Sequence, residues 1–160
     1  MDRRFAVRII RAETPDEIRA AGLLFREYVA WLAIDLSFQN FEEEVSNLPG
    51  DYAPPDGRLL LALSGIETAG CVALRRFEDR TCEMKRMWVR PRFRGQHIGR
   101  LLAESIIAQA RKIGYSEMVL DSLPWLASAL NLYKSLGFEV IAPYRYNPDP
   151  NAVFMRLHLQ

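Results

Sequence analysis

The sequence predicts an α+β fold: a mixed, mostly antiparallel central sheet of about seven strands, flanked by about four helices. Three strand-like segments joined by short links lie between residues 58 and 89, which predicts an antiparallel meander. A helical pattern that ends at a glycine and a further apolar strand follow, which predicts a right-handed crossover and a parallel strand pair. A chain of 160 residues is expected to form a single domain over residues 1–160.

The first long helix has a clear start signal. Thr14 can cap it, Pro15 suits its first turn, and Glu17 completes a capping box. Apolar residues then recur at helical spacing as far as Leu32, so one face of this helix is expected to be buried. The segments predicted around it are a strand over 5–10, a break over 35–40, a short helix over 41–48 and a surface loop over 48–57.

The remainder of the chain alternates strands, turns and helices. Gly114 and Gly137 stand where the C-terminal caps of two helices belong. The predicted segments are strands over 58–64, 67–76 and 81–89 with turns at 64–67 and 77–80, a helix over 96–113, a strand over 118–121, a helix over 124–136, and strands over 138–141 and 152–159.

The charges are segregated although the net charge is only +1. Residues 35–56 hold six acidic residues and no basic one, and residues 85–100 hold six Lys or Arg and no acidic one. This pattern predicts two distinct sites, or one site with two ends. A net charge so near zero gives no global argument for binding nucleic acid or a membrane surface, so neither is expected as a partner.

The two cysteines, Cys71 and Cys82, lie in apolar strand-like runs without a metal-binding spacing. They are expected to be reduced, buried thiols, which is typical of a cytoplasmic protein. No apolar run approaches the length of a membrane span, and the N-terminal segment lacks the apolar core of a signal peptide. The two histidines, His97 and His158, support no metal site, so no metal is expected.

The basic segment 84–100 reads as a strand, a glycine-bearing loop and the start of a helix. N–H groups in the first turn of a helix lack intrahelical partners, and the helix dipole favours negative charge there, so this loop is predicted to bind an anion. The glycines Gly95 and Gly99 have the wrong spacing for a Walker loop or for a dinucleotide-binding fingerprint.

Segment 94–99 (Arg-Gly-Gln-His-Ile-Gly) resembles the acyl-CoA loop of the GNAT-type N-acetyltransferase superfamily, [R/Q]xxGx[G/A]. It departs from that pattern at His97, where the family has glycine. The strand 82–89 and segment 132–138 (Leu-Tyr-Lys-Ser-Leu-Gly-Phe) resemble the family's strand before the loop and its LYxxxGF ending. The chain is most similar to small bacterial members, and the resemblance implies the acyl-CoA N-acyltransferase fold.

The resemblance implies direct transfer of an acetyl group from acetyl-CoA to a primary amine of a small molecule or peptide. Tyr133 is the implied general acid and Glu83 the candidate base, although Tyr133 could be a core residue and Glu83 could equally be a strand residue paired with Arg or Lys. Arg90 and Arg92 are further candidates for the outer phosphates, or plain solvated charges. The implied acetyl-CoA-binding residues are Met87, Trp88, Val89, Arg94, Gly95, Gln96, His97, Ile98, Gly99, Arg100 and Ser128.

The acceptor is expected to bind beside the acidic, aromatic first third of the chain. Trp31, Phe38 and Tyr52 are the candidate acceptor-binding residues, and acidic residues around them would attract a cationic amine. Residues 42–44, three consecutive glutamates, could instead be one solvated face of a short helix. Tyr144, Tyr146 and Asn147 could close the same pocket.

Two other classes of function remain open on the sequence. A non-catalytic acyl-CoA-binding regulatory module would keep the fold and the loop but transfer nothing. A nucleic-acid-binding domain would use the basic segment 85–100, but the near-neutral net charge and the LYxxxGF block argue against it. The protein is expected to be a monomer or a homodimer.

Overall fold

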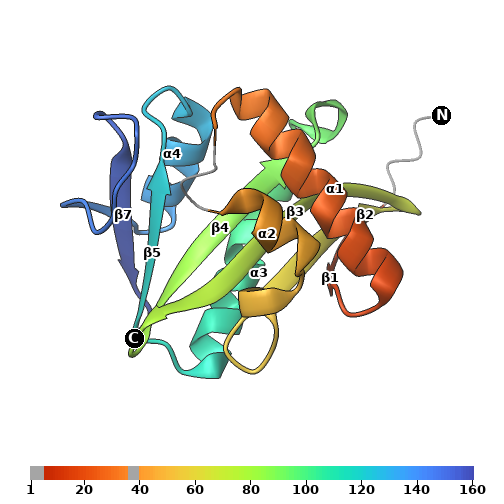
Figure 1. Cartoon of the computed structure of the whole chain (residues 1–160), viewed down its shortest axis with the longest axis horizontal. Coiled ribbons are helices and arrows are strands. Elements are labelled where there is room, and N and C mark those ends of the chain that lie inside the picture. Colours follow the sequence, from red (N-terminus) through yellow and green to blue (C-terminus); the bar gives the residue numbers. More distant parts are fainter. Residues whose placement is uncertain (1–5, 36–39) are drawn as a thin grey trace.

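The computed structural model describes residues 6–35 and 40–160. Its strands are β1 Val7–Arg11, β2 Arg58–Ser64, β3 Glu67–Glu78, β4 Thr81–Val89, β5 Glu117–Ser122, β6 Glu139–Ile141 and β7 Val153–His158. They form one sheet in the order β1-β2-β3-β4-β5-β7-β6 (Figure 1). The β4–β5 pair is parallel and the others are antiparallel, which confirms the predicted mixed sheet and its crossover.

Helices cover both faces of this sheet. The helices of the described residues are α1 Pro15–Leu32, α2 Phe41–Ser46, α3 Ile98–Ile113 and α4 Ala127–Ser135. Figure 1 shows α1 and α2 in front of the sheet and α3 behind it. Within residues 6–35 and 40–160, no helix combines the length and the apolar character that crossing a membrane would need.

Each face has its own apolar cluster. On one side, Leu102 and Ile106 of α3 pack with Cys82 and Met84 of β4. On the other side, Leu24 and Phe25 of α1 pack with residues that include Trp88. Met84 and Trp88 face opposite layers although they are four residues apart, which the period of a regular strand does not allow, so the strand is irregular between them.

The local signals for α1 are confirmed. The Glu17 N–H donates to Thr14 Oγ1 at 3.2 Å, and the Thr14 N–H donates to Glu17 Oε1 at 3.0 Å. Several predicted boundaries need correction, and the helix predicted over 124–136 begins only at Ala127. The turn predicted at 77–80 is narrower, because β3 continues to Glu78 and pairs there with Thr81. The helix predicted from residue 96 begins at Ile98, because His97 has a left-handed backbone with a φ of 62°.

A bulge in β4 separates this strand from β5. Arg86 has a φ of 60°, and the pairing with β3 shifts register at this point. Pairing between β4 and β5 covers Thr81–Glu83 of β4 and stops before the bulge. The two parallel strands diverge beyond it, and this divergence creates the space for the site.

Candidate active site

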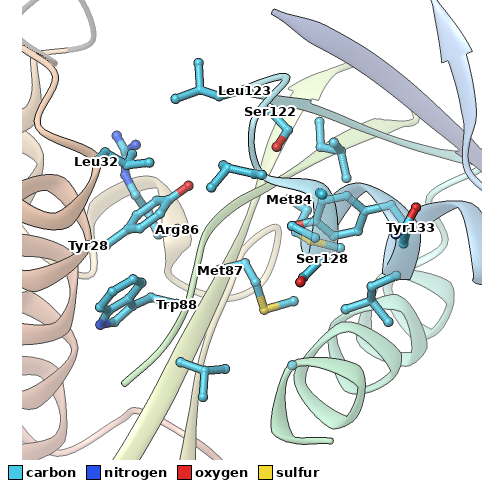
Figure 2. Close-up of a pocket in the computed structure, with 18 of the residues that line it drawn as sticks. Tyr28, Leu32, Met84, Arg86, Met87, Trp88, Ser122, Leu123, Ser128 and Tyr133 are labelled. Carbon is cyan, nitrogen blue, oxygen red and sulfur yellow. The ribbon is translucent and has the colours of Figure 1, made fainter. Parts of the chain in front are cut away.

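A cavity of about 870 Å³ lies where β4 and β5 separate. Figure 2 shows Tyr28, Leu32 and Arg86 on the side of α1, with Ser128 and Tyr133 across from them. Six parts of the chain contribute to its wall: the end of α1 with Ile34, the second half of β4, residues 93–100, the end of β5, residues 123–135 and Asn147. Both the anion loop and the Tyr133 region therefore open into one cavity.

The anion loop forms one end of this cavity. The Arg94 N–H donates to Pro91 O and the Leu101 N–H donates to His97 O. Among the described residues, no main-chain or side-chain acceptor takes the N–H groups of residues 95–100. These amides lie at the N-terminus of the 16-residue α3, where the helix dipole also favours an anion.

Two residues of this loop have left-handed backbones, Gly95 with a φ of 82° and His97 with a φ of 62°. His97, where the family pattern has glycine, therefore adopts a left-handed conformation that glycine adopts readily. Because His97 carries a Cβ, this left-handed conformation costs about 1–2 kcal/mol of stability. Gly99 is helical, and a Cβ there would meet only Leu132 and Val89 side chains at 3.7 and 3.9 Å.

The arginines of the basic segment have partners of different kinds. Arg100 donates to Ser135 Oγ at 2.7 Å and pairs with Glu104. The Arg94 guanidinium lies over the indole rings of Trp31 and Trp88, at 4.9 and 5.1 Å from their centroids. Arg94 and Arg100 both line the cavity.

Arg90 and Arg92 do not line the cavity. Arg90 forms a bidentate pair with Glu27, at 2.7 Å for the closest contact, and Arg92 pairs with Glu67 at 3.1 Å. Their predicted role at the outer phosphates therefore gains no support from their positions. Pairing of this kind along segment 85–100 also removes much of the open basic surface that a nucleic-acid site would need.

Tyr133 lies in the wall of the cavity on α4, and only 6% of its surface is exposed. Its ring packs against Phe138 with a centroid distance of 5.7 Å. Burial raises the pKa of the Tyr133 phenol well above its ordinary value, and the nearby Tyr28 adds to this. The phenol therefore keeps its proton at physiological pH and can donate it to a stronger base in the cavity.

Three tryptophans surround the middle of the cavity. Trp31 of α1 packs on Trp88 of β4 and on Trp125 of the loop after β5, with centroid distances of 5.1 and 5.3 Å. Tyr28 packs on the other part of Trp88 at 5.6 Å. Trp31 is 40% exposed and Trp125 is 53% exposed, so this aromatic wall borders solvent.

The bulge places two consecutive cations, Lys85 and Arg86, in the other end of the cavity, and each is 6% exposed. Nε and Nη2 of Arg86 donate to the two carboxylate oxygens of Glu44, at 2.9 and 3.0 Å. The predicted acidic and basic segments thus meet at this ion pair. Burial, with repulsion from Arg86 and Arg75, lowers the pKa of Lys85 to about 7.

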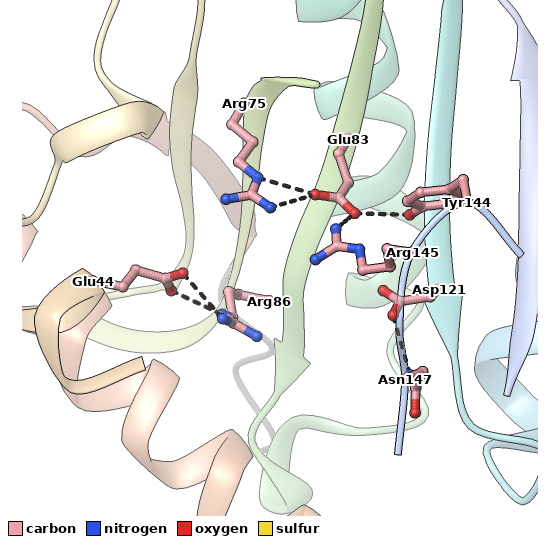
Figure 3. Close-up of polar contacts among 8 residues, drawn as sticks. All are labelled: Glu44, Arg75, Glu83, Arg86, Asp121, Tyr144, Arg145 and Asn147. Carbon is pink, nitrogen blue, oxygen red and sulfur yellow. Dashed lines mark hydrogen bonds and ion pairs between the residues drawn. The ribbon is translucent and has the colours of Figure 1, made fainter. Parts of the chain in front are cut away.

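Asp121 and Ser122 at the end of β5 face the same end of the cavity, together with Asn147. The Asn147 Nδ2 donates to Asp121 Oδ2 at 3.1 Å (Figure 3). A carboxylate on β5 therefore lies across the divergence from the cations on β4. In the described residues, no three His, Cys, Asp or Glu side chains gather into a metal-binding group.

Glu83, the predicted base, does not line this cavity. It precedes the divergence, where β4 is still paired with β5, and its side chain is fully buried. The carboxylate pairs with Arg75 at 2.9 Å, pairs with Arg145, and accepts a hydrogen bond from Tyr144 at 2.7 Å (Figure 3). This arrangement agrees with the alternative interpretation of Glu83, a strand residue that pairs with arginine.

Two of the other predicted site residues do not line the cavity: Tyr52 is buried in the cluster beneath α1, and Gln96 is exposed to solvent. Phe38 lies outside the described residues. The predicted residues that do line it are Trp31, Met87, Trp88, Val89, Arg94, Gly95, His97, Ile98, Gly99, Arg100, Ser128 and Tyr133.

The predicted site residues did not include Lys85, Arg86 or Asp121, which all line the cavity. One signal was present, because two consecutive cations inside an otherwise apolar strand cannot both point to solvent by alternation. A bulge is one way to place both on one face. Nothing in the sequence marks Asp121 in the same way.

Comparison with known proteins gives the family. The sequence model of the family described as "Acetyltransferase (GNAT) family" matches residues 25–138. A Schizosaccharomyces pombe protein described as an uncharacterized N-acetyltransferase is 43% identical over 155 residues, which covers 96% of this chain and 95% of that protein.

Solved structures share the fold. An acetyltransferase of the GNAT family from Staphylococcus aureus has a TM-score of 0.80 at 20% identity, covering 97% of this chain and all of that one. A Salmonella typhimurium protein solved with its cofactor acetyl-CoA has a TM-score of 0.68 at 22% identity, covering 97% and 95% of the two chains.

Proposed function

Because this chain belongs to the GNAT acetyltransferase family, we propose that it transfers an acetyl group from acetyl-CoA directly to a primary amine of a small molecule or peptide. The observation that carries the proposal is the single cavity of about 870 Å³, which runs from the amides of the anion loop past Tyr133 to charged side chains on β4 and β5. Such a cavity can hold an extended donor and an acceptor at once.

The anion loop fits the pyrophosphate of a CoA thioester. Its N–H groups at residues 95–100 have no acceptor within the described chain, and such a cradle holds phosphate oxygens without any side-chain charge. Ser128 and the Met87–Val89 part of β4 are suited to the arm that follows the pyrophosphate, because both line the cavity between the loop and Lys85. The Salmonella structure with acetyl-CoA supports the same donor.

The chemistry needs one bond formed and one broken. The amine nitrogen bonds to the acetyl carbonyl carbon, the carbon–sulfur bond breaks, and the sulfur leaves with the electron pair. Tyr133, which keeps its proton because of its burial, gives that proton to the departing thiolate. A main-chain N–H of residues 87–89 would stabilise the carbonyl oxygen as it becomes an anion.

The amine must lose two protons in the course of the reaction. Asp121, rather than Glu83, is placed to accept the first, since it lines the cavity while Glu83 is held between two arginines. The second proton, lost after the attack, restores the phenol of Tyr133. The net change is release of one proton for each acetyl group moved from a thioester to an ammonium ion.

Isothermal calorimetry with CoA and a thiol-release assay over a panel of amines test this function. We expect CoA binding together with acceptor-dependent thiol release. Absence of CoA binding would refute the proposal. CoA binding without turnover of any amine, and with no effect of Tyr133→Phe, would instead show a non-catalytic acyl-CoA-binding module.

Two further expectations accompany the proposed function. The buried thiols Cys71 and Cys82, both free, are typical of a cytoplasmic protein, and cell fractionation tests that location. We propose a monomer or a homodimer, which light scattering on the purified protein distinguishes.

A further inference from the structure

We infer that the acceptor is an amine that also carries a carboxylate, as a free α-amino acid does, and that Lys85 and Arg86 bind this carboxylate in the cavity. The inference rests on the proposed acetyl transfer and names the substrate class of the same site. It replaces the sequence-based expectation of an acidic pocket for a simple cationic amine.

The bulge at Arg86 creates the binding surface for an anion. In a regular strand, consecutive side chains point to opposite faces. Register with β3 passes from Lys85 opposite Ala73 to Trp88 opposite Cys71, so the bulge adds a residue to β4 between them. Lys85 and Arg86 lie at this bulge, both belong to the part of β4 that lines the cavity, and each is 6% exposed.

The acidic residues predicted to attract a cation do not face this cavity. Glu42 pairs with Arg26, and Glu44 forms the bidentate pair with Arg86. Neither glutamate lines the cavity wall. An amine without a carboxylate would bring only positive charge near Lys85 and Arg86, whereas a zwitterion also brings a negative charge to them.

The charge on Lys85 is disfavoured where it stands. Burial lowers its pKa to about 7, and repulsion from Arg86 and Arg75 contributes, against weaker opposing effects of Asp121 and Glu44. An added carboxylate beside Lys85 would favour its charged form and interact with Arg86 at the same time. The position proposed for the acceptor carboxylate follows from the geometry of the bulge and not from the pKa of Lys85.

A zwitterion has charges opposite to those on the two diverging strands, β4 with its cations and β5 with Asp121. Its carboxylate would lie against Lys85 and Arg86 on β4, and its ammonium would lie toward Asp121 on β5, the residue proposed to accept its proton. The walls nearby are apolar, formed by Tyr28, Leu32 and Leu123 (Figure 2). The acceptor side chain is therefore expected to be apolar rather than charged.

A matched substrate panel tests the inference. Each of the twenty standard amino acids is assayed beside its amide and its decarboxylated amine, with acetyl-CoA and the unmodified protein. We expect at least one apolar amino acid to exceed its amide and amine by more than tenfold in kcat/KM. Acetylation of amides or amines at equal or greater efficiency would overturn the inference while leaving the proposed acetyl transfer intact.

A panel without any acetylated compound leaves the wider proposal of acetyl transfer to the CoA-binding and thiol-release experiments above, and binding then decides the inference. Saturation-transfer NMR on the CoA-loaded protein would then show the amino acids binding in preference to their amides, or would show no preference and overturn it.

A variant assigns the effect to the bulge. Lys85→Met keeps the length and removes the charge, and we expect it to raise KM for the amino acid more than tenfold while leaving KM for the amide unchanged. Arg76→Met is the matched control, because Arg76 pairs with Asp56 at the surface, outside the cavity. An unchanged preference for acid over amide in Lys85→Met would contradict the assignment.

Discussion

At the proposed donor end of the cavity, the candidate anion-binding groups are main-chain amides from one short segment, residues 95–100, with the side chains of Arg94 and Arg100 beside them. At the acceptor end they are side chains from α1, β4, β5 and the segment around Asn147. The donor end depends on backbone conformation at two positions, Gly95 and His97. The acceptor end depends on buried charges, of which Arg86 and Glu44 form the central pair.

This difference shows how one fold can keep a donor and change an acceptor. Side-chain replacement in the loop alters few of the groups that would hold an anion, because main-chain N–H groups are common to all residues except proline. At the acceptor end, each recognition group is a separate side chain on a separate element, so single substitutions can alter both charge and specificity.

The largest effect is expected when the buried Arg86–Glu44 ion pair at the acceptor end is removed. Arg86 and Glu44 have side chains only 4% and 14% exposed. Arg86→Met leaves Glu44 without its bidentate partner, and we expect the free energy of unfolding in urea to fall by about 3–5 kcal/mol. The double variant Arg86→Met/Glu44→Met should recover most of that loss.

The control for this pair is Arg26→Met, which removes an exposed partner of Glu42 and should lower the free energy of unfolding far less than Arg86→Met does. Equal losses for Arg26→Met and Arg86→Met would show that the acceptor end does not depend on buried charge.

The next effect concerns the point between the two ends, Tyr133. We expect Tyr133→Phe to lower kcat by about 10²–10⁴-fold, because the phenol is the proposed proton donor, with little change in CoA affinity. Tyr144→Phe is the matched control, since its hydroxyl bonds Glu83 outside the cavity. Similar kcat values for the two variants would remove Tyr133 from the mechanism.

The third prediction concerns how the stability contributed by Lys85, at the acceptor end, depends on pH. Lys85 has its folded-state pKa lowered from 10.5 to about 7, so above pH 7 the unfolded chain binds more protons than the folded one. Stability contributed by this residue therefore rises with pH, by about 1 kcal/mol between pH 7 and 8. Besides burial, the charged groups acting on Lys85 include Arg86, Arg75, Asp121 and Glu44.

Urea unfolding of the wild type and Lys85→Met at both pH values isolates this contribution. The difference between the two proteins should change by about 1 kcal/mol in the stated direction. A difference that is constant with pH would mean that Lys85 titrates outside this window.

The fourth prediction concerns backbone conformation at the donor end. Gly95→Ala places a Cβ at a φ of 82°, and we expect a cost of about 1–2 kcal/mol and roughly tenfold weaker CoA binding by calorimetry. His97→Gly removes a Cβ from a φ of 62° and should bind CoA as tightly as the wild type. Weaker binding by His97→Gly than by Gly95→Ala would show that the histidine side chain, and not the loop path, holds the ligand.

Most of the fold was predictable because its signals are local. The capping box at Thr14, the glycines at 114 and 137, and the strand–helix–strand order each depend on neighbouring residues. The anion loop was predictable for the same reason. The acceptor end was not, because it joins Glu44 to Arg86 and Asp121 to Asn147 across long stretches of chain.

The position of Glu83 outside the cavity has a similar cause. Its position in the strand was predicted correctly, but its exposure depended on where β4 and β5 part, and that point is set by the bulge at Arg86. Arg145 and Tyr144, which enclose its carboxylate, come from a segment about sixty residues later in the chain. Alternation along one strand contains no information on such partners.

A crystal structure with CoA and the best amino-acid acceptor tests the two-ended cavity most directly. The account predicts pyrophosphate oxygens within hydrogen-bond distance of the amides of residues 95–100, the acceptor carboxylate on Lys85 and Arg86, and the acceptor nitrogen on the side of Asp121. A pyrophosphate bound away from this loop, or an acceptor carboxylate remote from both cations, would contradict it.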